Sequence, residues 1–237
     1  MFEILSTAEL TVSASIVASF LALTLARTAA GRFAVLGALG AWFVLVLAIG
    51  ATAALNPKTG LGVPGLGLSV ALPVVALVWA YAAVPAMRTA AAATPLPALI
   101  AVHVIRLLGV NFLILYAANR LPAPFAPTAG WGDIFIGATA APLAWAIARF
   151  GAPLRALALL WNALGTADLI AAVALGALSP PGPPDSSLMT TLPWFIIPGF
   201  LVPCLMFLHV VIFARLTKSE GMAPAHAWLT AGPAKTS

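Results

Sequence analysis

Polar side chains that lie within long apolar stretches are the residues of this sequence that could do chemistry. An ionisable group in such a stretch is costly to place in lipid, so it must face other protein groups and find a partner there. Groups of this kind bind or relay protons, bind ions, or ligate metals. The candidate residues are His103, Arg106, Asp133, Asn162, Asp168 and His209.

The composition around these residues rules out a water-soluble fold. Of 237 residues, 62% are hydrophobic and 7% are charged, and the mean hydropathy is +1.09. An ordinary soluble domain has roughly 25% charged residues. Eleven basic and six acidic side chains cannot solvate a globule of this size. The composition therefore predicts an integral membrane protein whose main partner is the lipid bilayer.

Apolar stretches of about 20 residues are long enough to cross a bilayer as helices. They predict an all-α, polytopic membrane protein, with a seven-transmembrane-helix bundle over residues 1–216 and a short tail over 217–237. Pro85 is placed inside the third span, and the seventh span, with Pro198 and Pro203, is expected to be the most bent. The predicted spans are 9–27, 33–55, 67–87, 96–117, 131–149, 155–178 and 191–215.

The basic residues between the spans predict the orientation, because cytoplasmic loops accumulate Lys and Arg. If the N-terminus lies outside, two basic residues, Lys58 and Arg120, face outward. Eight face the cytoplasm: Arg27, Arg32, Arg88, Arg149, Arg155, Arg215, Lys218 and Lys235. The N-terminus is therefore expected outside and the C-terminal tail in the cytoplasm. The acidic start, MFEILSTAEL, does not predict a cleaved signal peptide.

The depth of each polar residue follows from the helical rise of about 1.5 Å per residue. His103, Asn162 and His209 come out at a similar depth in the inner leaflet, while Arg106 and Asp168 lie nearer the midplane. This predicts an ion pair between Arg106 and Asp168, with two imidazoles and an amide in a layer beneath it. Asp133 is expected where the fifth span leaves the outer surface.

Three interpretations of this polar centre stay open. In the first, the groups are purely structural hydrogen bonds and a buried ion pair between helices. In the second, a non-enzymatic protein binds or translocates a small ligand, an ion or a proton through spans four, six and seven. In the third, His103 and His209 are the ligands of a haem or of another metal in a membrane redox protein.

Other functions lack the residues that they need. The sequence contains neither a Ser, His and acid spacing nor an HExxH motif, so no motif in it predicts catalysis. Retinal is excluded because the lysines, Lys58, Lys218 and Lys235, lie outside the seventh span. The single Cys204 cannot form an intrachain disulfide or a thiolate cluster. Basic residues scattered singly between spans do not predict nucleic-acid binding.

Three stretches resemble a group of small, uncharacterised bacterial inner-membrane proteins. They are RLLGVNFLILYAANRLPAPFAPTAGWGDIFIGATAAP, WNALGTADLIAAVALG and PWFIIPGFLVPCLMFLHVVIFARL. The resemblance covers residues 103–215, the last four spans, and not the first three. It implies a bacterial origin and a place in the cytoplasmic membrane, but no activity and no site residue.

Overall fold

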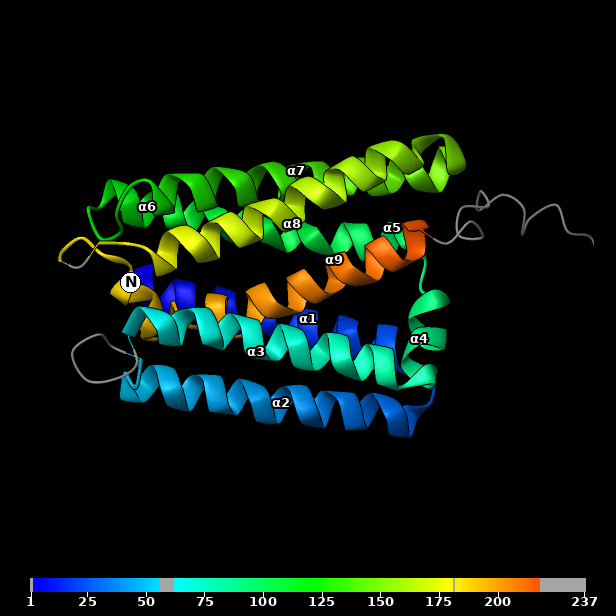
Figure 1. The fold of residues 1–237 in the computed structure, drawn as a ribbon, viewed down its shortest axis with the longest axis horizontal. Helices are drawn as coiled ribbons and strands as arrows, with labels where there is room; N and C mark the ends of the chain where they lie inside the picture. Colours follow the sequence, from blue (N-terminus) through cyan, green and yellow to red (C-terminus); the bar gives the residue numbers. More distant parts are fainter. Residues whose placement is uncertain (1, 56–61, 181, 218–237) are drawn as a thin grey trace, which may run out of the picture.

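The computed structural model describes residues 2–55, 62–180 and 182–217, and within these ranges it is helical, with no strand (Figure 1). Seven helices are long and apolar enough to cross a membrane. The sequence-based prediction of an all-α, seven-helix membrane protein is confirmed at this level. Lys58, Lys218, Lys235, His226 and the predicted tail beyond Thr217 lie outside the described residues.

Four of the spans are single long helices, and three, the fourth, sixth and seventh, are composite. Span four joins α5, a 3-10 segment η1 and α6, while span seven joins a π-helical segment η4 and α9. The elements are α1 Phe2–Leu25, α2 Ala29–Thr52, α3 Gly62–Ala83, α4 Pro85–Ala92, α5 Leu96–Ala101, η1 Val102–Gly109, α6 Val110–Ala117, α7 Phe125–Phe150, η2 Ala152–Leu154, α8 Arg155–Ala177, η3 Ser186–Thr190, η4 Ile197–Leu201 and α9 Val202–Thr217. The sixth span, Ala152–Ala177, includes the short η2 ahead of α8.

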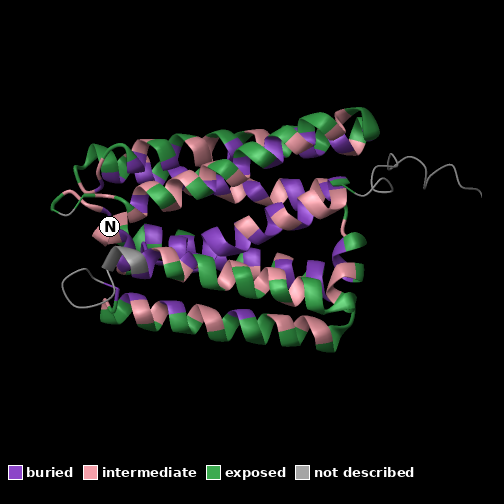
Figure 2. Cartoon of the chain, viewed as in Figure 1, coloured by how far each residue is buried: buried purple, intermediate pink, exposed green. Residues whose placement is uncertain are grey.

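The long helices run side by side along the length of the molecule, and α4 lies across one end (Figure 1). The seventh span is the central one, because 72% of its most apolar window is buried, against 17% for α2 and 11% for α3 (Figure 2). It packs against α3 and α8, and span four packs against α7. Since α2 and α3 expose apolar side chains over most of their length, they have the surfaces that suit contact with lipid.

Several helices begin or end some residues away from the approximate span boundaries predicted from the sequence, and prolines and glycines explain most of the differences. The third span ends at Ala83 instead of 87, because Pro85 is the first residue of α4 and not a kink within a helix. The fifth begins at Phe125 instead of 131, because Pro127 lies in the first turn, where no backbone N–H is needed. The seventh begins at Ile197 instead of 191, since residues 191–195 form turns.

The first two helices also begin earlier than the predicted spans. Helix α1 begins at Phe2 instead of 9, and α2 covers Ala29–Thr52 instead of 33–55. The sixth span covers Ala152–Ala177 against a predicted 155–178, and the fourth covers Leu96–Ala117, as its prediction did. The first difference arises because the prediction lets charged residues end the span, whereas the backbone of α1 continues through Glu3 and Glu9.

Within the spans, two segments of five or more residues depart from α-helical winding, one on span four and one on span seven. Residues Val102–Gly109 of span four form a 3-10 helix, which is unusually long for this winding. Residues Ile197–Leu201 of span seven form a π-helix that includes Pro198. The irregularity expected in the seventh span therefore occurs at Pro198, whereas the 3-10 segment had no counterpart among the predictions.

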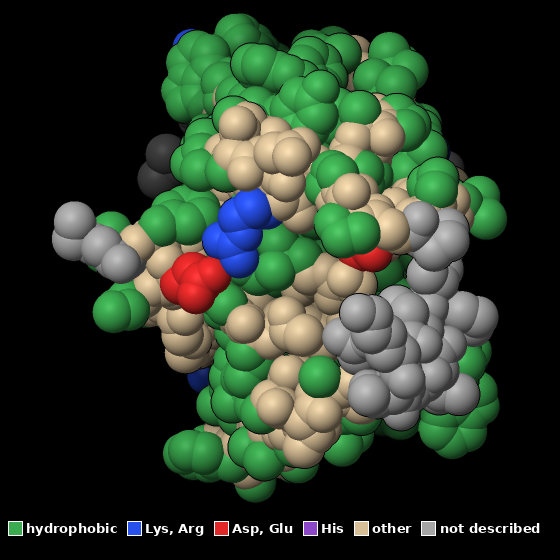
Figure 3. All heavy atoms as spheres, turned by 90° about the vertical axis from the view of Figure 1, so that its left-hand side faces the viewer, with side chains coloured by type: hydrophobic (Ala, Val, Ile, Leu, Met, Phe, Trp, Pro, Cys, Tyr) green, Lys and Arg blue, Asp and Glu red, His purple; other side chains and the backbone are tan. Residues whose placement is uncertain are grey.

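Charged side chains separate between the two ends of the molecule. Figure 3 shows the end of the molecule near the N-terminus, where a basic and an acidic side chain meet on a surface that is otherwise largely apolar. Near that terminus, Arg120 Nη2 forms an exposed ion pair with Glu3 at 2.8 Å. The other surface arginines lie in the turns and helix ends of the opposite side: Arg27, Arg32, Arg88, Arg149, Arg155 and Arg215. Arg215 there donates from Nη1 to the carbonyl oxygens of Ala91 and Thr94, at 3.0 and 2.7 Å, which attaches the end of α9 to the end of α4.

Candidate functional site

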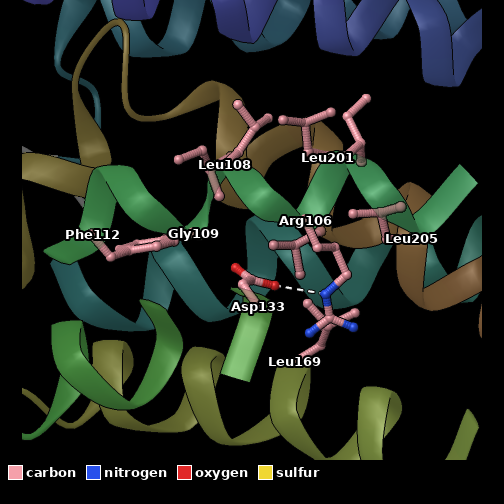
Figure 4. A pocket seen from close by; sticks show the side chains of 11 residues that line it. Arg106, Leu108, Gly109, Phe112, Asp133, Leu169, Leu201 and Leu205 are labelled. Carbon is pink, nitrogen blue, oxygen red and sulfur yellow. Dashed lines mark hydrogen bonds and ion pairs between the residues drawn. The ribbon is translucent and has the colours of Figure 1, made fainter. Parts of the chain in front are cut away.

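Arg106 is the centre of a buried polar cluster formed by the 3-10 segment, α7, α8 and α9. It is 2% exposed. Its Nε donates to Asp133 Oδ1 at 2.6 Å (Figure 4), and its Nη2 forms an ion pair with Asp168. Its Nη1 donates to the carbonyl oxygen of Gly165 at 3.0 Å and lies 3.2 Å from His209 Nε2. The guanidinium thereby joins three other helices through one side chain.

His209 and Asn162 form the second part of the cluster, and both are fully buried. His209 Nδ1 lies 2.7 Å from Asn162 Oδ1, and Asn162 Nδ2 donates to the carbonyl oxygen of His209 at 3.0 Å. An arginine can only donate, so His209 Nε2 accepts from Arg106 and Nδ1 carries the proton that it donates to Asn162. The hydrogen bonds therefore select one neutral tautomer of His209.

His103 completes the cluster, although its side chain forms no hydrogen bond within the part of the chain that the structure describes. Its side chain is fully buried, and both ring nitrogens lack a partner among the described residues. Its ring lies 4.2 Å from that of His209, centroid to centroid and tilted by 32°, and meets the Trp161 ring edge-on at 5.5 Å. The His103 ring therefore packs against two other rings, and its nitrogens have no hydrogen-bond partner within the described residues.

These contacts do not fit the interpretation of His103 and His209 as the two axial ligands of a haem. Axial imidazoles lie on opposite faces of a porphyrin, whereas these two rings contact each other. His209 Nε2 is also engaged by Arg106. Within the described residues, no three or more His, Cys, Asp or Glu side chains come together in a way that could hold a metal ion.

The 3-10 winding of span four places the polar residues of this segment on one side of the helix. In a 3-10 helix residues at i and i+3 eclipse each other, so His103, Arg106 and Gly109 share one edge. In an α-helix the same three-residue step falls short of a full turn by about 60°. The edge faces α7, α8 and α9, where the partners of Arg106 lie.

Glycines on the 3-10 segment and on two neighbouring helices leave the space that the cluster occupies. A Cβ atom on Gly165 would lie 2.6 Å from His209 Cε1 and 3.2 Å from Arg106 Nη1. A Cβ on Gly109 would lie 2.5 Å from Asp133 Cβ, and one on Gly132 would overlap the Asp168 carboxylate. Sequence reasoning did not assign these glycines to the site, although each lies within three residues of a polar group in the GWGD, RLLG and LGTAD stretches.

A cavity of about 30 Å³ lies beside Arg106 and Asp133 (Figure 4). A single water needs roughly 10–15 Å³ measured in this way, so the cavity has room for about two or three waters. Its wall is otherwise apolar and comes from the 3-10 segment, the π-helix and their neighbours, with Leu108, Phe112, Leu169, Leu201 and Leu205 among the lining residues. The cavity therefore brings a water-sized space to the charged groups of a largely dry bundle.

The structure brings all the candidate residues of the sequence together, with two corrections. The predicted ion pair between Arg106 and Asp168 is present. Asp133 does not mark the end of its span; it lies in the third turn of α7 and is the second carboxylate on Arg106. The expected separation into two layers is also wrong, because His209 contacts Arg106 directly.

A family model described as a domain of unknown function, DUF8737, matches residues 63–217, which is well over half of the chain. The chain belongs to the DUF8737 family. The predicted membership of an uncharacterised family is confirmed, but the third span lies inside the DUF8737 match, contrary to the resemblance over 103–215. All residues of the cluster lie within the DUF8737 region. No curated protein and no solved structure matches the chain.

Proposed function

We propose that this protein binds and relays a proton through the buried cluster around Arg106. One guanidinium lies between two carboxylates, Asp133 and Asp168, so the three groups sum to a formal charge of −1 unless a proton is bound. An uncompensated charge inside a bundle is costly, and one proton on the carboxylate pair cancels it. Two acidic groups and one basic group, on three different helices, are therefore the observation on which the proposal rests.

The cavity beside the cluster favours a proton over a small organic ligand. With about 30 Å³ it accommodates water and leaves no room for an organic molecule of several heavy atoms. The side chains of Asp133 and Asp168 are 15% and 14% exposed, whereas that of Arg106 is 1% exposed. Water in the cavity thus provides a donor or an acceptor next to Asp133, while the arginine stays enclosed.

The proposal includes the orientation and the membrane. Six arginines lie toward the C-terminal end of α9 and one, Arg120, lies at the end with Glu3, which by the positive-inside rule supports an N-terminus on the outside. The resemblance to bacterial inner-membrane proteins supports the bacterial cytoplasmic membrane. An enzymatic reporter fused after Ser237 is expected to behave as cytoplasmic, and periplasmic behaviour would contradict this orientation.

Proton binding is tested with purified protein in lipid vesicles. We expect the infrared band of a protonated carboxyl group to change with pH in the wild type, and proton flux through the vesicle membrane to be measurable with a pH-sensitive dye. Asp133→Asn and Asp168→Asn should each remove the band change and lower the flux by about a hundredfold, in the range found for positioned acids and bases.

The matched control is Glu3→Gln, which makes the same chemical change at the exposed ion pair with Arg120 and should leave both measurements unchanged. Replacing sodium by a bulky organic cation should also leave the flux unchanged. A flux that requires sodium would assign the site to a metal cation instead. If both Asn variants fold and conduct like the wild type, the cluster is structural and the proposal is wrong.

A further inference from the structure

His103 has a feature that the proton site on the carboxylates leaves unexplained. A neutral imidazole carries one N–H donor and one acceptor nitrogen, and in His103 neither has a partner among the described residues, although the side chain is fully buried. Buried polar atoms are nearly always paired, because leaving one unpaired costs about 1–3 kcal/mol. Two unpaired nitrogens in a fully buried side chain need an explanation. The explanation that we pursue is that the acceptor nitrogen of His103 is free in order to bind a proton.

The charges of the cluster allow the proton to occupy either of two places at the same total. With the proton on Asp133 or Asp168, the set of Arg106, two aspartates and a neutral His103 sums to zero. With the proton on His103, two cations face two carboxylates, and the sum is again zero. Moving the proton between these places therefore creates no net buried charge.

His209 cannot serve as the second place in this arrangement. Its Nε2 accepts from Arg106 Nη1 at 3.2 Å, and its Nδ1–H donates to Asn162 Oδ1 at 2.7 Å, so no lone pair is free. His103, which contacts the His209 ring, is the imidazole of the cluster with an unoccupied lone pair.

We infer that His103 is a second proton-binding residue of this protein, an inference that rests on the proposed function. In the transfer, the O–H bond of a protonated Asp168 breaks and an N–H bond forms on His103. The products are an Asp168 carboxylate and a His103 imidazolium, while Arg106 and Asp133 keep their charges. The imidazolium then faces the same carboxylate pair that Arg106 holds.

The 3-10 segment is the element that can bring the two groups together. No hydrogen bond or ion pair joins His103 to Asp168 among the described residues, so one of them must move or a water must bridge them. Rewinding from 3-10 to α geometry turns His103 relative to Arg106 by about 60°. The cavity borders the 3-10 segment at Arg106 and Gly109, and it leaves space into which this segment can move.

The groups that set the charge state of His103 come from its own segment and from the helices around it. Helix α1, which also packs against the 3-10 segment, carries Glu9, whose Oε2 accepts from Asn111 Nδ2 at 3.2 Å. The groups of the cluster itself are nearer. They are Arg106 on its own segment, His209 of α9 and, through Arg106, Asp133 of α7 and Asp168 of α8. Trp161 of α8 contacts the ring but carries no charge.

Solid-state nitrogen NMR of histidine-labelled protein in lipid vesicles tests the inference, with His103→Gln used to assign the signal. We expect an imidazolium signal from His103 that grows as the pH falls. Asp168→Asn should abolish it, because Arg106 and Asp133 then already balance each other. His103→Gln should lower the proton flux by about a hundredfold, while the pH-dependent carboxyl band persists.

The control is His226→Gln, which removes the third histidine of the chain, beyond the described residues, and should change neither the His103 signal nor the flux. Circular dichroism and thermal unfolding in detergent check that each variant folds. A carboxyl band that responds to pH together with a His103 that stays neutral at every pH, and with His103→Gln conducting normally, overturns this inference alone. A wild type without any carboxyl response overturns the proposed function as well.

Discussion

At the residue scale, the cluster depends on the shape of arginine. Arg106 contacts four acceptors on three helices: Asp133, Asp168, the Gly165 carbonyl and His209. The guanidinium presents five N–H donors in a rigid plane, whereas a lysine presents three donors at one point. Charge alone therefore does not account for this residue, and its donors set the positions of the surrounding groups.

Arg106→Lys is expected to destabilise the protein although it keeps the charge. At least one buried acceptor loses its donor, and this costs about 1–3 kcal/mol. The free energy of unfolding in mixed micelles measures the effect. Arg120→Lys, at the exposed pair with Glu3, should change it by less than about 1 kcal/mol. Equal effects at the two positions would contradict the role given to the donor geometry.

Gly165→Ala is expected to disturb the cluster by overpacking. The added methyl group would lie 2.6 Å from the His209 ring, and overpacking of this kind costs about 1–3 kcal/mol. Gly40→Ala is the matched control, because nothing lies within 4 Å of its Cβ position, and it should be neutral or slightly stabilising. Thermal unfolding of both variants measures the difference in stability. A Gly165→Ala variant as stable as the wild type would show that the cluster does not need the space beside Gly165.

At the element scale, two non-α segments lie next to the same cavity. Arg106, Leu108 and Gly109 of the 3-10 segment, and Ile197 and Leu201 of the π-helix, all line it. Both windings have poorer hydrogen-bond geometry than an α-helix and occur often at hinges and functional sites. Their meeting beside the charged groups indicates that this is where the bundle is easiest to rearrange.

Filling the cavity should slow proton access without unfolding the protein. Leu201→Phe adds a ring at the cavity wall, and the water-sized space beside Asp133 should close. We expect the proton flux to fall by about tenfold, with water excluded from the carboxylate. Leu45→Phe, on a surface position that is 56% exposed, makes the same substitution away from the cavity and should leave the flux unchanged. A normal flux in Leu201→Phe would show that protons reach the cluster by another route.

At the scale of the whole molecule, the separation of charge between the two ends is the main global property. The surface arginines crowd the end where α9 finishes, and the other end carries one exposed pair, Arg120 with Glu3. Because α9 is buried against its neighbours along most of its length, the molecule has an interior to hold the cluster and an apolar exterior for lipid.

Labelling of single introduced cysteines tests the orientation on intact cells. The native Cys204 is fully buried and should give little background. Leu178→Cys, at an 80% exposed position at the end of α8, should react with a membrane-impermeant maleimide from outside. Ala30→Cys, in the first turn of α2, should react only after the cells are opened. The reverse pattern would invert the proposed orientation.

The sequence by itself determined the membrane class, the number of spans and the pairing of Arg106 with Asp168. These follow from the lengths of apolar runs and from the scarcity of charges within them, which are local properties of the chain. The sequence also drew attention to His103, Asn162 and His209, because a polar residue in an apolar run needs a partner. Its depth arithmetic assumed α-helical winding throughout.

Only the tertiary structure decided which groups touch. Asp133 became the second partner of Arg106 because α7 begins earlier than its prolines and glycines indicated, and the two histidines came into ring contact. The 3-10 winding that aligns His103 with Arg106, and the glycines that seat the carboxylates, depend on how closely neighbouring helices approach. Helix contacts of this kind are set by packing between distant segments, so no local pattern of residues encodes them.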